Sequence, residues 1–266
     1  MIRVNYAVQV CDLASYQGGS RFCGDDRTML SKKSLQSLIN SIAHCVEQRP
    51  SVQHHVMMVH DHTSEDLIKW ITAMIDRHNG QSMTLELHAL APRTGIADSI
   101  EYCYQWLQQN HSDLVFQVQD DYLFDSWAIY DSLDQFYQIY QDCGIHAVIQ
   151  PFNDISHWNH LYKNSATPRM ISTGCHGYWI QIYDTSCSFM TSQWQFNQHW
   201  DLYREFFRLI PEKSPHGLES RSLNHMFTRR GVLGMTPVNT LSHHIQQYPD
   251  PYQSWKKIWD QINIYD

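Results

Sequence analysis

Short apolar runs alternate with helix-like apolar spacings along the first 150 residues, and this alternation constrains the fold more than any other feature. The predicted strands are 6–11, 56–59, 83–90, 114–118 and 145–149. Between them, apolar residues recur with a period of three to four, which predicts amphipathic helices. Strands that alternate with helices at this spacing indicate an α/β fold with a mostly parallel sheet. Ligands of such sheets bind outside the carboxyl ends of the strands.

The second half of the chain is less regular than the first. It predicts a strand at 178–183, one aromatic helix at about 192–210 and one helix at about 218–230. We expect one catalytic domain over 1–246, with a donor half at 1–125 and an acceptor half at 126–246. The tail at 247–266 carries Trp255, Ile258, Trp259 and Ile262 at helical spacing. Two lysines are too few for strong attraction to a membrane surface, so we expect this helix to pack back on the domain.

Composition excludes several classes of protein. The 266 residues carry 19 Lys and Arg against 27 Asp and Glu, a net charge of −8, which argues against nucleic-acid binding through positive charge. No apolar run reaches the roughly 18–20 residues of a transmembrane segment, and the start lacks the apolar stretch of a signal peptide. The seven cysteines form no Cys-x-x-Cys pair, so reduced thiols and a cytoplasmic location are expected.

Two adjacent carboxylates, Asp120 and Asp121, directly follow the buried strand at 114–118. Two neighbouring acids at the end of a buried strand repel one another unless a cation neutralises them. Mg²⁺ and Mn²⁺ prefer oxygen ligands and bridge to phosphates, so a divalent metal site is one interpretation. The alternative is an acidic turn that caps the next helix.

Two further strand ends carry polar side chains. Asp61 follows the second strand, in a run where Thr63 and Asp66 suggest a capping box for the next helix. An acid here can accept a hydrogen bond from a nucleobase, or it can serve helix capping alone. Arg93 and Gly95 precede the third helix, a combination that suits an anionic ligand and equally suits an ordinary turn.

Six motifs in this order resemble the GT-A glycosyltransferases, which transfer a sugar from a nucleotide diphosphate donor. The resemblance covers about residues 4–246. Its motifs are 59–66, 93–99, 119–121, the glycine-bearing loop 172–179, Glu219-Ser220 with Gly231 eleven residues beyond Ser220, and 241–245. Each motif is weak alone, and their shared order carries the resemblance.

The resemblance implies an α/β, GT-A-like single domain and a transferase that uses a nucleotide sugar, with UDP as the expected nucleotide. It implies Mn²⁺ or Mg²⁺ held by Asp121 and His244, with His243 as the alternative histidine. The residues implied for the nucleotide are Cys11, Asp61, Arg93 and Asp120. The residues implied for a carbohydrate or other hydroxyl acceptor are Gly174, His176 and Trp179, and Trp194 and Trp200 are further candidates for a ring-stacking platform. The aromatic side chains also suit a core.

The sequence departs from the family pattern at two places. Gln119 stands where the metal motif has its first acid, and Ser220 stands where inverting enzymes place their base. Glu219 is then the expected base, with Asp154 and Asp201 as spare candidates. An inverting transfer with some donor hydrolysis is expected. The alternatives are a sugar nucleotidyltransferase, favoured by Gly18, Gly19 and Arg21 after the first strand, and a non-catalytic carbohydrate- or nucleotide-binding protein.

Overall fold

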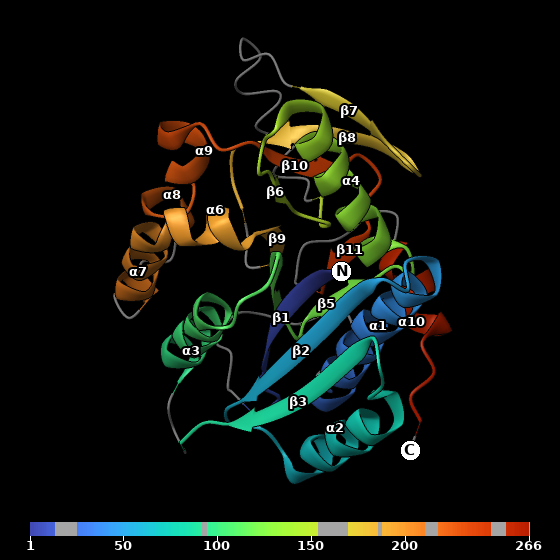
Figure 1. Cartoon of the computed structure of the whole chain (residues 1–266). Coiled ribbons are helices and arrows are strands. Elements are labelled where there is room, and N and C mark those ends of the chain that lie inside the picture. Colours follow the sequence, from blue (N-terminus) through green and yellow to red (C-terminus); the bar gives the residue numbers. More distant parts are fainter. Residues whose placement is uncertain are drawn as a thin grey trace.

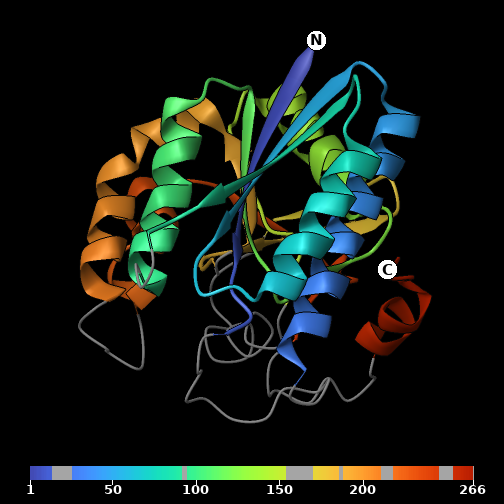
Figure 2. The ribbon, with the colours of Figure 1, turned by 90° about the horizontal axis from the view of Figure 1, so that it is seen from below.

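A nine-stranded sheet lies between two layers of helices in the computed structural model of the chain (Figures 1 and 2). The structure describes residues 1–13, 26–91, 95–153, 170–185, 188–210, 218–245 and 254–265. The strand order is β3-β2-β1-β4-β9-β6-β10-β8-β7, and a separate pair joins β5 to β11. The predicted α/β class is confirmed, with a mixed sheet that is continuous across the two proposed halves.

The strands of the large sheet are β1 (Ile2–Val10), β2 (Val52–His60), β3 (Met83–Ala89), β4 (Leu114–Gln119), β6 (Val148–Ile149), β7 (Ile171–Gly174), β8 (Gly177–Ile182), β9 (Phe189–Ser192) and β10 (Gly234–Pro237). The small pair is β5 (Tyr122–Phe124) and β11 (Ser242–His244). The helices are α1 (Arg27–Gln48), α2 (Glu65–His78), α3 (Ile96–Gln109), α4 (Ala128–Cys143), α6 (Gln193–Gln198), α7 (Trp200–Leu209), α8 (Leu218–Arg221), α9 (His225–Arg230) and α10 (Ser254–Gln261).

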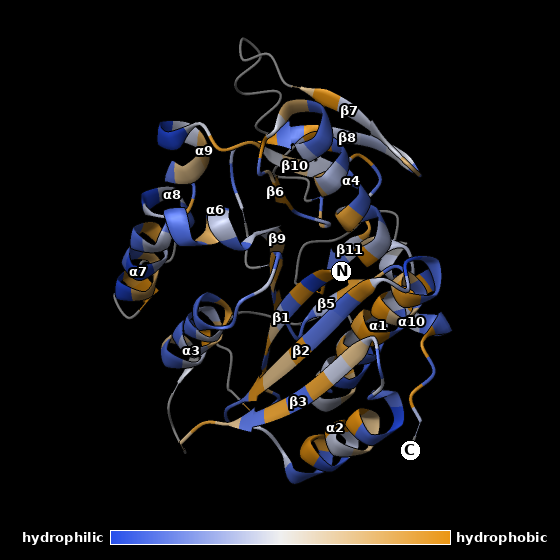
Figure 3. Cartoon of the chain, viewed as in Figure 1, coloured by the Kyte–Doolittle hydropathy of each residue, from blue (hydrophilic) through white to orange (hydrophobic). Residues whose placement is uncertain are grey.

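The central strand β1 shows why the sheet is covered on both faces. It pairs in parallel with β2 on one side and with β4 on the other. Tyr6 and Val8 pack in a core with residues of α1, α2 and α4, whereas Ala7 packs in a second core with residues of α3 and α7. Successive side chains of a strand point to opposite faces, so a strand that is buried at every position from Val4 to Val10 needs helices on both sides. Figure 3 shows hydrophobic segments on these strands that alternate with hydrophilic ones.

Two predicted helices are each divided in two. The helix expected at 192–210 breaks at His199, whose backbone (φ −114°, ψ 20°) leaves the helical region between α6 and α7. The His199 ring lies 3.1 Å from Nη1 of Arg230 on α9, which ties this break to another helix. The helix expected at 218–230 breaks between α8 and α9, where Asn224 Oδ1 accepts a hydrogen bond from the Thr185 backbone N–H. Tertiary contacts therefore interrupt a local helical pattern.

Several boundaries also differ from the sequence prediction, and β1 and β2 each begin four residues before the strands predicted at 6–11 and 56–59. The strand expected at 145–149 is confined to β6, because only Val148 and Ile149 pair with neighbouring strands. The α2 cap is Ser64, whose Oγ accepts from the Leu67 N–H at 3.2 Å. Thr63, the predicted cap, instead donates its hydroxyl to the Val10 carbonyl at 3.2 Å.

The C-terminal helix α10 packs back on the domain, as the sequence predicts. Ile262 is buried with Leu30, Leu123 and Ile245, and Trp259 packs against this cluster. Lys33 Nζ donates to the carbonyls of Trp259 (2.7 Å) and Ile262 (2.6 Å), and so supplies donors to the end of α10 that its own backbone cannot. Among the described helices, none is both long and apolar enough to cross a bilayer.

We expect Gly234→Ala to lower the free energy of unfolding by about 1–3 kcal/mol, because it overpacks the core. A Cβ at Gly234 would stand 2.7 Å from Phe227 Cε1 and 3.1 Å from the Ile182 carbonyl oxygen, a backbone atom that cannot rotate away. Urea unfolding measures the change. Gly80→Ala is the matched control, because its Cβ would meet nothing nearer than 4.0 Å. Equal stability of the Gly234 variant and wild type would contradict this packing.

Candidate active site

The carboxyl ends of β1, β2 and β4 meet at one edge of the sheet. The Cys11 N–H donates to Asp120 Oδ2 at 2.9 Å, and the Asp61 N–H donates to the Val10 carbonyl at 3.3 Å. The residues that follow three separate strands are thus linked directly to one another. Parallel strands bring their ends to the same edge, which makes this edge the expected ligand crevice.

Asp121 and His244 meet at this edge, although 123 positions separate them in the sequence. His244 Nε2 lies 3.1 Å from Asp121 Oδ2, and both side chains are largely buried, at 15% and 13% exposed. The antiparallel pairing of β5 with β11 places His244 opposite Tyr122, and the Ile245 N–H donates to the Asp121 carbonyl at 2.8 Å. The register of this short sheet therefore creates the pair.

The His244 ring is held by aromatic neighbours on two sides. It stacks on Tyr122 with ring centroids 4.4 Å apart and planes 2° apart, and it meets Phe152 edge-on at 5.9 Å. Such packing fixes the orientation of the imidazole before any ligand arrives. A rigid nitrogen donor beside a rigid carboxylate is a preorganised arrangement for recognising a cation.

The Asp121–His244 pair fits a divalent metal ion whose remaining ligands would come from substrate phosphates and water. Carboxylate oxygen and imidazole nitrogen are both ligands of Mn²⁺. Neighbouring ligands of an octahedral ion with bonds of about 2.1 Å stand about 3 Å apart, close to the separation of this pair. Within the described part of the chain, no group of three or more His, Cys, Asp or Glu side chains is placed to hold a metal. Two protein ligands leave positions for substrate phosphates and water, as is usual for Mg²⁺ at nucleotide sites.

Asp120 accepts hydrogen bonds that join separate segments of the fold. Its Oδ2 accepts hydrogen bonds from the Cys11 N–H and from Ser31 Oγ at 2.6 Å. Asp120 therefore joins β4, the end of β1 and the first turns of α1. The sequence reasoning missed Ser31, which looks like any helix-surface serine until α1 is placed against β4.

The nearby Asp12, which the sequence reasoning also missed, links the segments that follow β1 and β2 to the start of α1. This residue is 5% exposed, and its carboxylate accepts from the Ser64 N–H (2.7 Å), Ser64 Oγ (2.6 Å) and Thr28 Oγ1 (2.7 Å). The signal that could have identified Asp12 is its position one residue after Cys11, in the loop that follows the first predicted strand. Arg93 and Arg21 lie outside the described residues.

Asp61 is buried at the end of β2 and joins two loops. Its Oδ2 accepts from the Gly95 N–H at 2.7 Å, and its Oδ1 lies 2.8 Å from His62 Nδ1. The side chain is only 6% exposed. This places Asp61 at the predicted nucleotide edge, in contact with the more exposed His62.

Glu219, the predicted base, lies on a different face of the sheet from the Asp121–His244 pair. It belongs to α8, whose neighbours Leu218 and Leu223 pack with α3 and α7, whereas Tyr122 of β5 packs in the core against α1. Figure 1 shows α7 and α8 on the opposite side of the molecule from α1 and α10. The role of Glu219 stays a prediction.

Asp201, one of the spare base candidates, is committed to an ion pair. Arg230 donates to Asp201 Oδ1 at 2.9 Å and also binds Oδ2. This hydrogen bonding lowers the pKa of Asp201, which makes its carboxylate a weaker base. Asp154 lies outside the described residues.

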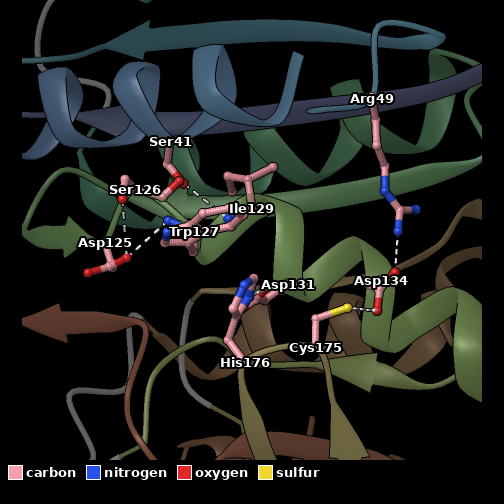
Figure 4. A network of polar contacts seen from close by, with 10 residues as sticks. All are labelled: Ser41, Arg49, Asp125, Ser126, Trp127, Ile129, Asp131, Asp134, Cys175 and His176. Atoms are coloured by element: carbon pink, nitrogen blue, oxygen red, sulfur yellow. Dashed lines mark hydrogen bonds and ion pairs between the residues drawn. The ribbon is translucent and has the colours of Figure 1, made fainter. Parts of the chain in front are cut away.

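His176 belongs to a polar network between α1, α4 and the β7–β8 turn (Figure 4). Its Nδ1 lies 2.6 Å from Oδ1 of the buried Asp131, and its ring packs on Trp127 at 4.3 Å. Arg49 pairs with Asp134, and the Cys175 thiol lies 2.7 Å from the other oxygen of Asp134. That contact raises the pKa of Cys175 to about 11, which keeps the thiol protonated near neutral pH.

This network and the Asp121–His244 pair lie at opposite ends of β5. Asp121 directly precedes the strand and Asp125 of the network directly follows it, so the three strand residues, about 10 Å of extended chain, lie between them. The predicted acceptor residue His176 is thus placed apart from the predicted metal ligands. The sequence reasoning missed the buried Asp131 and the partly buried Asp134, because an acid on a helix is normally exposed.

Gly174 and Trp179 have a packing role in the structure. The Trp179 side chain is 2% exposed and lies in the main core, so its ring offers no face to an acceptor sugar. A Cβ on Gly174 would stand 2.5 Å from Trp179 Nε1, which explains a glycine there. The prediction that Trp179 stacks on an acceptor sugar is therefore corrected, because its ring is buried in the core. Of the three candidates, Trp194 is the most exposed, at 56%, and Trp200 is partly buried.

No protein-family model and no curated protein sequence matches the chain. The chain shares its fold with a solved structure of S. aureus TarS, at a TM-score of 0.53 and 12% identity, covering 97% of this chain and 39% of that one. A mannosyltransferase from Pyrobaculum calidifontis, PcManGT in complex with GDP-Man and Mn²⁺, matches at a TM-score of 0.49 and 14% identity, covering 98% and 61%. The chain spans less than two thirds of the length of either.

The matched structures are glycosyltransferases, and the likeness to TarS shows that this chain has the GT-A-like fold predicted from its motifs. At this level of identity the likeness concerns the fold alone. What the chain does is argued below from its own residues.

Proposed function

We propose that this chain is a metal-dependent glycosyltransferase that uses a nucleotide diphosphate sugar, with UDP as the expected nucleotide. The observation that carries the proposal is the Asp121–His244 pair, in which two preorganised ligands stand 3.1 Å apart at the carboxyl edge of the sheet. Asp120 and Asp12 brace the strand ends around the pair. The fold likeness supports this choice among the functions that such an edge can serve.

The chemistry assigned to the site is displacement at the anomeric carbon. An acceptor hydroxyl forms the new carbon–oxygen bond, the bond to the diphosphate breaks, and a nucleoside diphosphate leaves. Asp121 and His244 would hold Mn²⁺ or Mg²⁺, which when bound stabilises the negative charge of the leaving diphosphate. Glu219 is proposed as the base for the acceptor proton from the sequence pattern alone, because it lies on the other face of the sheet from the Asp121–His244 pair. Water in place of the acceptor gives donor hydrolysis.

The test is a donor panel with the purified full chain. We expect release of nucleoside diphosphate from at least one nucleotide sugar in the presence of Mn²⁺, loss of release with EDTA, and recovery when Mn²⁺ is restored. Chromatography of the products measures release directly. A chain that neither binds nor cleaves any nucleotide sugar at millimolar concentration would contradict the proposal.

Two other results would point to the alternative functions. Release of pyrophosphate from a nucleoside triphosphate and a sugar phosphate would indicate a nucleotidyltransferase. Metal-dependent nucleotide binding without turnover, with a broad set of sugar acceptors present, would indicate a binding protein on the same scaffold.

A further inference from the structure

The strand pair that carries the proposed metal ligands is too small to hold its own shape. β5 and β11 have three residues each, and His244 lies opposite Tyr122 in their antiparallel pairing. An isolated pair of strands is marginally stable at best in water. The separation between Asp121 and His244 therefore depends on what packs against this pair from outside.

One face of the β5–β11 pair packs in the main core of the domain. Tyr122 and Phe124 of β5 are buried there, and Ser34 Oγ of α1 donates to the Tyr122 carbonyl at 2.7 Å. The Ser242 N–H donates to the Pro151 carbonyl at 3.2 Å, which holds the start of β11. These contacts fix β5 and the start of β11 against the domain.

The other face of the pair packs against the C-terminal helix α10. Leu123 of β5 and Ile245, which directly follows His244, are 0% and 1% exposed, and both lie in one cluster with Ile262. The Ile245 N–H also donates to the Asp121 carbonyl at 2.8 Å. Ile245 is thus next to one proposed metal ligand in the chain and hydrogen-bonded to the other, and the C-terminal segment packs on it.

Lys33 of α1 holds α10 in this position (Figure 1). Its Nζ donates to the carbonyls of Trp259 (2.7 Å) and Ile262 (2.6 Å), and it lies 5.3 Å from the centroid of the Trp259 ring. Two positions earlier on α1, Ser31 Oγ donates to Asp120 Oδ2. The segment of α1 that binds the end of α10 is therefore the same segment that borders the strand ends of the candidate site.

We propose that α10 is a working part of the metal site: by packing on Ile245 it holds His244 beside Asp121, and it thereby sets the affinity for Mn²⁺. Ile262 and Lys33 are then positioning residues, because they act through α10 and β11. Groups that orient metal ligands from outside change metal affinity or activity by roughly 10–100-fold when they are altered. This inference rests on the proposed function, because it assumes that a metal binds the Asp121–His244 pair.

Ile262→Ala and Lys33→Met in the full chain test the inference. Ile262→Ala removes the side chain that packs with Ile245, and Lys33→Met removes the donors to the end of α10 while it keeps an apolar stem. We expect both variants to need about tenfold more Mn²⁺ for half-maximal release of nucleoside diphosphate, with rates at saturating Mn²⁺ within about threefold of wild type. The electron paramagnetic resonance signal of free Mn²⁺ measures metal binding without turnover, and it should show the same tenfold shift.

Hydrogen exchange over residues 241–245, followed by mass spectrometry, measures the positioning itself. The Ile245 N–H is bound to the Asp121 carbonyl in the folded chain, and it exchanges only when this contact opens. We expect faster exchange of this segment in both variants than in wild type, because a loosened α10 lets the end of β11 open more often.

Ile139→Ala and Lys69→Met are the matched controls. Ile139, on α4, is 6% exposed and Ile262 is 5% exposed, so the first control removes a similarly buried side chain away from α10. The Lys69 side chain is 80% exposed on α2. Both controls should keep the Mn²⁺ requirement of wild type.

The outcomes separate this inference from the function on which it rests. An unchanged Mn²⁺ requirement in Ile262→Ala and Lys33→Met, with or without faster exchange, would overturn the role of α10 while leaving metal-dependent transfer intact. An equal rise of the requirement in the controls would also overturn it. Absence of Mn²⁺ binding and of donor turnover in wild type would overturn the proposed function, and the inference with it. A raised requirement in both variants, with the controls unchanged, supports the inference.

Discussion

Asp121→Asn should lower metal-dependent donor turnover by at least about a hundredfold, because it removes the anionic one of the two protein ligands in the proposed metal site. The asparagine can still hydrogen-bond His244, so the fold around β5 and β11 should persist. Initial rates of nucleoside diphosphate release, measured across a Mn²⁺ titration, test this. His244→Gln should require more Mn²⁺ for half-maximal rate, because it removes a nitrogen ligand and the ring that stacks on Tyr122.

Asp125→Asn is the matched control for this prediction. Asp125 follows β5 at the end opposite Asp121, and its Oδ1 accepts from the Trp127 N–H at 3.0 Å. The change alters one carboxylate by the same chemistry without touching the proposed metal ligands. Rates within about threefold of wild type for both Asp121→Asn and Asp125→Asn would exclude Asp121 as a metal ligand.

The buried pair of His54 and Tyr6 should make the protein lose stability as the pH falls. His54 is 2% exposed, and its Nδ1 lies 2.9 Å from the Tyr6 hydroxyl. Burial lowers the pKa of His54 to about 4, and burial raises the pKa of Tyr6, so the phenol donates to a neutral imidazole. The unfolded chain binds a proton at His54 near pH 6.5, before the folded chain does. His54 therefore costs no stability above about pH 6.5, and the loss grows as the pH falls toward about 4, reaching about 3 kcal/mol.

Urea unfolding at several pH values between about 7.5 and 4 measures this loss. Other histidines also titrate over this range, among them His60 and His199, whose pKa values burial lowers. His54→Gln separates the contribution of His54, because the variant should lose about 3 kcal/mol less than wild type over the same range. Parallel pH profiles for the two proteins would contradict the prediction.

The first half of the fold is readable from the sequence because its elements are local. Each strand or helix in this half has a clear apolar period of its own and packs its apolar face against the core. The strands β1 to β4 and the helices α1 to α4 therefore occur in the predicted order and regions of the chain. The prediction of one continuous helix fails where contact with a distant residue interrupts that helix. His199 interrupts the helix at 192–210 in contact with Arg230, 31 positions away, and no local pattern contains that contact.

The candidate site shows the same division. The strand-end acids Asp61, Asp120 and Asp121 stand out in the sequence because each follows an apolar run. Their separate tasks depend on partners from elsewhere: Gly95 and His62 for Asp61, Ser31 for Asp120, and His244 for Asp121. Trp179 shows the opposite case, since an aromatic residue in a glycine-bearing loop suits either a sugar platform or a core, and only its burial decides.

The sequence by itself determined the α/β class, the edge of the sheet where a ligand would bind, and the carboxylates at that edge, because periodicity and strand ends are local properties of the chain. Only the tertiary structure decided which histidine meets Asp121. His243 and His244 are neighbours on β11 and point to opposite faces, so a shift of one residue in the pairing with β5 would exchange them. That register depends on packing across the whole domain, with Tyr122 and Phe152 around the imidazole, and no short segment of sequence contains it.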